Sequence, residues 1–260
     1  MSSEAFSSRL TRAIFGLPSA CFTDPLHGIL VVPNSQDITK IDALIIGPED
    51  TPYAGGMFAF RLAFPQDYPA GPPRVKLVTT GSGTVRFNPN LYMNGKVCLS
   101  ILGTWSGPSW SSSQSLASVL LSIQSLLNAH PAANEPGFRA TSKTTEAYDA
   151  VIAHETLRVA VLGTLVDPDS SLHPDLVKSA VDLACGNASM YAQTAKGWAH
   201  LDGKSFADPF VRNVGGQNTG VFDFSGLASS IAEQIQQRIE AAESCSASSD
   251  TSGSDTDSDS

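Results

Sequence analysis

Four cysteines are the side chains of this sequence best suited to covalent chemistry, because a thiolate is a strong nucleophile. They are Cys21, Cys98, Cys185 and Cys245, and no two of them form a Cys-x-x-Cys pair. This spacing excludes the common zinc-ribbon patterns and disfavours a disulfide scaffold. We therefore expect free thiols in a reducing compartment, the cytoplasm or the nucleus.

Cys98 differs from the other three in its surroundings. Residues 81–113 are rich in Gly, Asn, Pro and Ser and show no convincing period of a helix or strand. A loop of this length inside a compact domain is commonly functional. A free cysteine is usually an inert buried thiol, and we assign that role to the other three. Cys98 is therefore the candidate nucleophile.

Strand-like runs precede this loop and should form its scaffold. Short connectors rich in turn-forming residues favour an antiparallel meander. In the third run Phe58, Phe60 and Leu62 alternate with smaller or polar residues, so its two faces should differ. Four prolines in residues 65–73 predict a rigid connector, with Tyr68-Pro69 as a candidate cis peptide. The predicted strands are 28–32, 39–46, 57–64 and 74–80.

Apolar residues at helical spacing flank the strands on both sides. The pattern predicts a first helix over 3–17. Ser111 and Gln114 fit the capping box of another helix that ends near Asn128. The remaining predicted helices cover about 145–165, a segment beginning at Pro174, and Leu227 to Ile239. The fold class is α+β: a four-stranded antiparallel meander flanked by an N-terminal helix and C-terminal helices, with a helical extension.

The charge balance limits the partners. Lys and Arg total 16 against 25 for Asp and Glu, a net charge of −9. Binding to nucleic acid or to an anionic membrane needs basic surface, so we expect neither partner. No apolar run approaches the ~20 residues that span a bilayer. The first 30 residues also lack the pattern of a signal peptide.

Two segments together carry a family resemblance. Residues 68–73 read YPAGPP, and residues 88–99 read NPNLYMNGKVCL. The sequence resembles the ubiquitin-conjugating enzymes, whose hallmark is Tyr-Pro-x-x-Pro-Pro, His-Pro-Asn and Gly-x-(Ile/Val)-Cys-Leu. Their cysteine follows the asparagine by eight residues, the separation of Asn90 and Cys98. The resemblance covers about residues 3–165 and implies the ubiquitin-conjugating fold.

A narrower similarity extends to nearly the whole chain. Residues 86–90, 99–105, 134–138 and 154–160 are similar to the large Z-type ubiquitin-conjugating enzymes. That group also has a C-terminal extension and a Ser/Asp tail. The resemblance therefore implies a catalytic core over 1–165, a helical extension over 166–243 and a disordered acidic tail over 244–260.

The family chemistry gives Cys98 and Asn90 their expected roles. Cys98 would accept ubiquitin or a ubiquitin-like modifier from an activating enzyme as a thioester, in an ATP-dependent pathway. An amine, usually a substrate lysine, would then attack it. Both steps pass through an oxyanion, which the Asn90 amide could stabilise as a donor. Asn90 could equally serve as a turn former that orders the loop.

The same resemblance defines the expected partners. These are the modifier, an activating enzyme (in the Z-type group the second, non-standard one) and, as an optional third partner, a ubiquitin ligase. The tandem ubiquitin-like modifier of vertebrates is the alternative cargo. We expect a monomer with no cofactor and no metal.

The chain departs from the family pattern at four places. Asn88 replaces the histidine of His-Pro-Asn, and Ser100 stands where many members carry Asp. The usual Trp-Ser-Pro-Ala appears as residues 110–113, four residues later than usual. Ala70 replaces a large apolar residue that contacts RING ligases. The change at Ala70 favours a dedicated ligase or ligase-independent transfer over the standard RING-ligase contact.

Two other functions compete with the carrier. One is a non-catalytic ubiquitin-binding scaffold of the same fold, although such variants normally lack the cysteine. The other is a Cys–His hydrolase, which would need His130 or His154 against Cys98, and no hydrolase signature supports it.

The C-terminal segments each have two interpretations. The extension could recognise an activating enzyme or a modifier, or it could cap the core. In the tail, Ser252, Ser254 and Thr256 each lie three residues before an Asp, a pattern that acidophilic kinases favour. The alternative is a solvating end.

Overall fold

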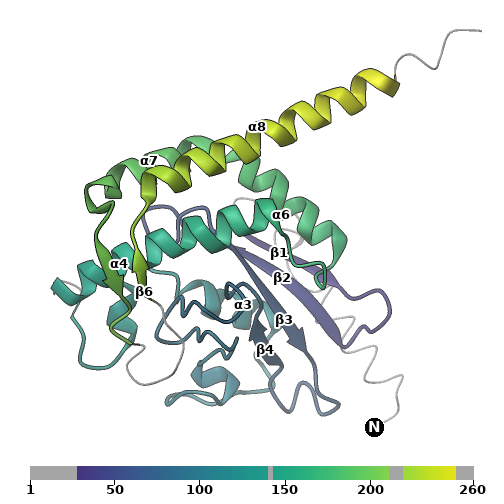
Figure 1. Ribbon diagram of the computed structural model, residues 1–260. Coiled ribbons are helices and arrows are strands. Elements are labelled where there is room, and N and C mark those ends of the chain that lie inside the picture. The colour runs from purple at the N-terminus through teal and green to yellow at the C-terminus, as the bar shows by residue number, and fades with distance from the viewer. Residues whose placement is uncertain (1–27, 140–142, 211–218, 250–260) are drawn as a thin grey trace, which may run out of the picture.

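The computed structural model describes residues 28–139, 143–210 and 219–249. The predicted helix over 3–17 lies outside these ranges. Figure 1 shows an antiparallel sheet in the strand order β1-β2-β3-β4, which confirms the predicted meander. Its strands are β1 (Ile29–Pro33), β2 (Lys40–Ile46), β3 (Met57–Ala63) and β4 (Arg74–Leu77).

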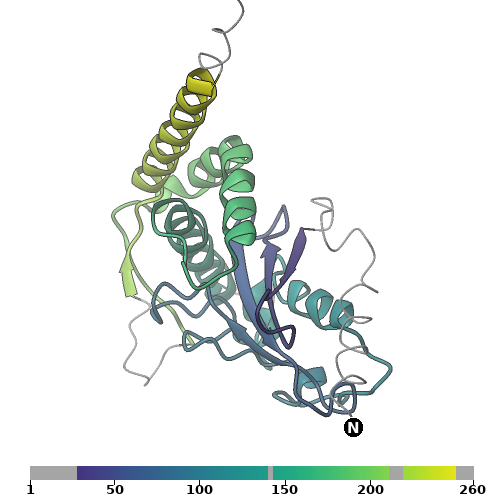
Figure 2. The same cartoon turned by 90° about the vertical axis from the view of Figure 1, so that its right-hand side faces the viewer.

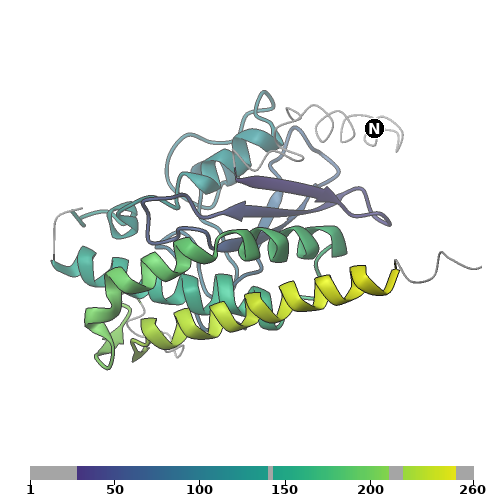
Figure 3. The same cartoon turned by 90° about the horizontal axis from the view of Figure 1, so that it is seen from above.

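The sheet buries both of its faces, whereas the alternation in β3 predicted two different faces. Opposite Phe58 and Phe60 lie Ile45 and Ala43 of β2, and all four belong to a core shared with α3 (Leu116–Gln124). The intervening residues of β2 and β3 belong to a second core with the later helices. Figure 3 shows α3 beyond one face and α4, α6 and α8 beyond the other. We call the face that carries Leu44, Met57 and Ala59 the outer face.

The start of α3 corrects the predicted capping box. Ser115 is the N-cap: its hydroxyl accepts from the Ser118 backbone N–H, while the Ser118 hydroxyl bonds back to the Ser115 N–H. Ser115 is extended, with φ −121° and ψ 170°, as a cap requires. Ser111 and Gln114 instead form a separate turn before the helix. The helix therefore begins one turn later than predicted, and it ends at Gln124 rather than near Asn128.

The predicted helix over about 145–165 is confirmed, but its winding changes along its length. It consists of α4 (Lys143–Glu155), the π-helix η4 (Thr156–Gly163) and the short α5 (Thr164–Val166). Long π-helices are rare. Apolar periodicity does not distinguish π from α winding over so few turns, so the π-helix could not be predicted from it.

The extension contains the two predicted helices and other elements that the sequence did not predict. Its helices are α6 (Pro174–Gly186), α7 (Ala188–Trp198), the 3-10 turn η5 (Ala199–Leu201) and α8 (Phe224–Ser249). The elements that were not predicted are α7, η5 and a hairpin of β5 (Ser205–Ala207) and β6 (Thr219–Val221). The helix α8 continues past residue 243, where composition placed the start of the tail. Figures 1 and 2 show its last turns projecting beyond the body.

A cross-strand ion pair attaches the extension to the outer face. Arg61 donates from Nε to Asp42 Oδ1 at 2.9 Å and from Nη2 to the Ser171 carbonyl at 2.5 Å. The other oxygen of Asp42 accepts from the His173 backbone N–H at 3.0 Å. Because Asp42 and Arg61 face each other across β2 and β3, the sheet presents both partners in fixed register.

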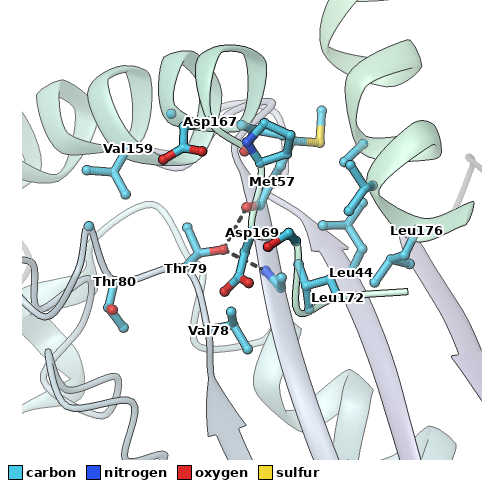
Figure 4. Close-up of a pocket in the computed structure, with 18 of the residues that line it drawn as sticks. Leu44, Met57, Val78, Thr79, Thr80, Val159, Asp167, Asp169, Leu172 and Leu176 are labelled. Carbon is cyan, nitrogen blue, oxygen red and sulfur yellow. Dashed lines mark hydrogen bonds between the residues drawn. The ribbon is translucent and has the colours of Figure 1, made fainter. Parts of the chain in front are cut away.

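A cavity of about 570 Å³ remains between the outer face and the linker to α6. Figure 4 shows Leu44 and Met57 on the sheet side, Val159 on the π-helix, and Asp167 and Asp169 on the linker. Within the described residues, no helix is long and apolar enough to cross a membrane.

Candidate functional site

The loop before the candidate nucleophile is closed by two reciprocal hydrogen bonds. The Cys98 backbone N–H donates to the Asn90 carbonyl at 2.9 Å. In return the Asn90 side-chain Nδ2 donates to the Cys98 carbonyl at 2.8 Å. The turn between them depends on Gly95, whose φ is +86° and where a Cβ would meet the Leu77 carbonyl oxygen at 2.6 Å. The structure thus brings the two sequence-predicted site residues together.

The Asn90 side chain is buried, with an exposed fraction of 4%. Its amide nitrogen carries two hydrogens, and the Cys98 carbonyl takes one of them. Its Oδ1 is buried without a hydrogen-bond partner among the described residues. The Asn90 amide therefore has one hydrogen and its oxygen beside Cys98 that make no hydrogen bond within the described residues.

Cys98 is 2% exposed, so its thiol is screened from solvent. The segment that follows it is held close by Thr104, whose hydroxyl accepts from the Leu99 N–H at 3.0 Å and donates to the Val97 carbonyl at 2.8 Å. Beyond it, Gly107 lies where a Cβ would stand 2.9 Å from Ser100 Cβ.

Asn88, which replaces the histidine of the family motif, hydrogen-bonds to several parts of the chain. It is fully buried, and its Nδ2 donates to the Tyr53 hydroxyl at 3.0 Å and to the Leu126 carbonyl at 2.8 Å. Its Oδ1 accepts from the Asn90 backbone N–H at 3.0 Å and from Asn134 Nδ2 at 3.3 Å. Asparagine can therefore serve at this position, because one planar amide both donates and accepts.

The displaced tryptophan still anchors the end of the cysteine loop. Trp110 Nε1 donates to the Pro69 carbonyl at 2.8 Å, and its ring lies 6.1 Å from that of Tyr68. The Tyr68-Pro69 peptide is cis, as the sequence indicated. The additional residues between Cys98 and Trp110 therefore leave this contact in place.

Neither candidate histidine serves Cys98. His130 Nδ1 lies 3.3 Å from Asp149 Oδ2. His154 is buried, and its Nδ1 bonds to Glu155 Oε1 at 3.0 Å while its Nε2 accepts from the Asp223 N–H at 3.3 Å. Both nitrogens of His154 thus have partners, and Nε2 contacts the extension at Asp223. This geometry gives no support to a Cys–His hydrolase.

Sequence reasoning missed Thr104, Asn134 and Arg86. Each of them binds backbone or side-chain atoms of the Asn88–Leu99 segment. All three lie in the segments of Z-type similarity, but no role could be assigned to them from the sequence, because it appears only through contacts made in the folded chain. Among the described residues, no group of three or more His, Cys, Asp or Glu side chains could hold a metal ion.

Comparison with known proteins assigns the family. The family model for ubiquitin-conjugating enzyme matches residues 19–156. The chain belongs to this family and has its α+β fold; it is a ubiquitin-conjugating enzyme. Membership implies interaction with ubiquitin, an activating enzyme and ubiquitin ligases.

The similarity to individual relatives extends into the extension. Ubiquitin-conjugating enzyme E2 Z of Xenopus tropicalis is 48% identical over 84% of this chain and 68% of its own length. The Homo sapiens E2 Z is 45% identical over 92% of this chain and 67% of its own. The chain thus spans about two thirds of these relatives. The solved human E2 G1 is 32% identical, with a TM-score of 0.40 over 49% of this chain and 98% of that one. No structural conclusion is drawn from a TM-score this low.

The Asn88 network predicts a stability loss. Asn88→Leu removes the amide at similar volume, and it leaves the Asn90 N–H without its acceptor. We expect the free energy of unfolding to fall by about 2–3 kcal/mol, measured by urea denaturation. The control is Asn94→Leu, at an exposed turn residue whose Oδ1 accepts from the Lys96 N–H. A loss no larger than that of the control would contradict the assigned role.

The buried carboxyl of Asp149 should make the stability of the folded chain depend on pH. Burial raises the pKa of its carboxyl from 3.8 to about 6, although His130 opposes this. The folded state therefore binds this proton more tightly, and the contribution of Asp149 to stability falls as pH rises from about 4 to 6. Asp149→Asn should stabilise the chain relative to wild type by an amount that grows over this interval and then levels off. Urea denaturation at half-unit pH steps measures it, and a pH-independent difference would refute it.

Proposed function

We propose that Cys98 carries ubiquitin, or a ubiquitin-like modifier, as a thioester and passes it to an amine. The supporting observation is the reciprocal Asn90–Cys98 hydrogen bonding inside the motif loop. The intact cysteine in a complete motif argues against the scaffold alternative.

Both chemical steps proceed through Cys98 Sγ. The Cys98 thiolate attacks the thioester carbonyl on the activating enzyme; a carbon–sulfur bond forms, the old one breaks, and the enzyme's thiolate leaves. An amine nitrogen then attacks the new thioester. The carbon–nitrogen bond forms, the bond to Cys98 breaks, the Cys98 thiolate leaves, and the proton of the amine passes to water.

Asn90 is suited to the oxyanion that both steps create. Its amide already lies against the Cys98 backbone, where the acyl group will be attached, and it retains one unassigned hydrogen. A buried donor is worth more than an exposed one, because low dielectric strengthens its interaction with developing charge. Because neither histidine serves Cys98, orientation and desolvation of the amine replace strong local base catalysis.

The wider assignments belong to the same proposal. Residues 1–165 form the catalytic core, 166–243 the extension and 244–260 an acidic tail. The Z-type resemblance supports the second, non-standard activating enzyme as the donor, in an ATP-dependent pathway, and a monomer as the working form. Cys98 and Cys185 are free thiols, which suits the cytoplasm or nucleus.

A charging assay tests the site of the thioester. Full-length protein is incubated with ATP, ubiquitin and each of the two activating enzymes in turn, then run on a non-reducing gel. Wild type should give a band that a thiol reductant removes, and Cys98→Ala should give none. Cys185→Ala is the matched control and should charge normally, since burial raises the pKa of the Cys185 thiol. Absence of a band with both enzymes would overturn the carrier assignment.

Discharge of the preformed thioester tests Asn90. Asn90→Ala should still reach wild-type endpoint charging, because Cys98 is unchanged. Its single-turnover discharge to free lysine should be about 10²–10³-fold slower, the usual cost of a lost oxyanion donor. Asn94→Ala, in the same loop, should discharge as wild type. An Asn90→Ala rate equal to that of Asn94→Ala would reduce Asn90 to a turn former.

A further inference from the structure

One contact of the extension lies at the catalytic segment itself. Phe210, three residues beyond β5, packs against the main core although its neighbours in sequence belong to the extension. Its backbone carbonyl accepts from Arg86 Nη1 at 3.1 Å. Arg86 in turn lies four residues before Asn90. This contact connects segments that are 124 residues apart in the chain.

The Arg86 guanidinium binds the two residues that directly precede Asn90. Its Nε donates to the Asn88 carbonyl at 3.3 Å, and its Nη2 donates to the Pro89 carbonyl at 2.5 Å. Three carbonyls thus surround one planar, permanently charged group. A guanidinium can satisfy all three at once because its donors have a fixed fork geometry.

Aromatic rings complete the surroundings of the guanidinium. Its central carbon lies 4.2 Å from the centroid of the Tyr92 ring and 5.8 Å from that of Phe210. Tyr92 follows Asn90 by two residues. Arg86 therefore contacts the backbone just before Asn90 and the side chain just after it, and this restrains Asn90 on both sides.

Phe210 is itself fixed by contacts on both of its sides. Its backbone N–H donates to Asp208 Oδ1 at 2.8 Å, and Asp208 is buried. Its ring meets those of Phe138 at 4.9 Å and Tyr148 at 4.8 Å, both near edge-to-face. These contacts hold Phe210 in place. Because its carbonyl binds Arg86, the position of Phe210 can affect that of Arg86.

We propose that Arg86 is a positioning residue for Asn90, and that Phe210 makes the extension part of this support. The proposal rests on the function assigned above to Cys98 and Asn90. In aminolysis the negative charge develops on the carbonyl oxygen of the acyl group attached to Cys98 Sγ. The Asn90 amide reaches that charge only when its backbone keeps the place that Arg86 gives it. The extension then contributes to the rate of transfer.

Single-turnover discharge to free lysine measures the effect. Misplacement by about 1 Å can cost up to ~10²-fold in rate, so Arg86→Ala should slow discharge by ~10–100-fold. Arg86→Lys keeps the charge but loses the fork, and it should stay near the alanine variant. Phe210→Ala should slow discharge ~5–10-fold, and Phe210→Tyr, which keeps the ring, should restore it. Val221→Ala, at an exposed hairpin residue, is the control and should discharge as wild type.

A double variant separates positioning from a general loss of structure. If Arg86 acts through Asn90, adding Arg86→Ala to Asn90→Ala should cost little further rate, because the donor is already absent. If the rate losses of the two single variants multiply in the double variant, the proposal is overturned. Thermal unfolding of every variant shows that it is folded. Should Arg86→Ala fail to fold, Asn90→Ala combined with Phe210→Ala makes the same test.

The two levels of proposal fail in different ways. If wild type does not charge on Cys98, the proposed function is wrong. If wild type charges, Asn90→Ala is slow, and Arg86→Ala and Phe210→Ala discharge as wild type, only the positioning role is wrong.

Discussion

The buried amide of Asn88 is the contact on which the candidate site depends. It joins Tyr53 from the β2–β3 connection, the backbone at Leu126 after α3, and the Asn90 N–H. Those partners belong to three parts of the chain, so the amide fixes the motif loop relative to the sheet and the helix at once. Asn90 is bound in turn to Cys98. A histidine is the family's residue here, but an amide satisfies the same geometric demand because it donates and accepts in one plane.

A second constraint comes from the two-sided sheet. Leu44, Met57 and Ala59 make the outer face apolar, and an apolar face must be covered. The extension covers it, with Asp42 and Arg61 setting where the linker to α6 attaches. Core and extension therefore share one continuous hydrophobic cluster. This arrangement explains why His154 is buried among the rings of Phe206 in β5, Phe222 between β6 and α8, and Phe224 in α8. His154, which the sequence offered as a candidate base, instead has a structural role between the core and the extension.

Much of the fold could be predicted, and the errors have physical causes. The meander was predictable because alternation and short connectors are local properties of the sequence. The start of α3 was misplaced because serines stand at both 111 and 115, and either can cap; packing of Leu116 and the following apolar residues selected Ser115. The β5–β6 hairpin was missed because its strands have three residues each, too few to show a period. Its pairing is a long-range contact.

The sequence by itself determined the family, the candidate nucleophile and its separation from Asn90, because these lie within one short motif whose residue types the chemistry requires. It also determined that Asn88, Ser100 and Ala70 depart from the pattern. Only the tertiary structure decided what those departures do and which other residues support the site. The bond of Asn88 to Tyr53, that of His154 to Asp223 and that of Arg86 to Phe210 join residues that lie 35 to 124 positions apart. Local sequence patterns do not indicate such pairs, because only the packing of the whole chain brings them together.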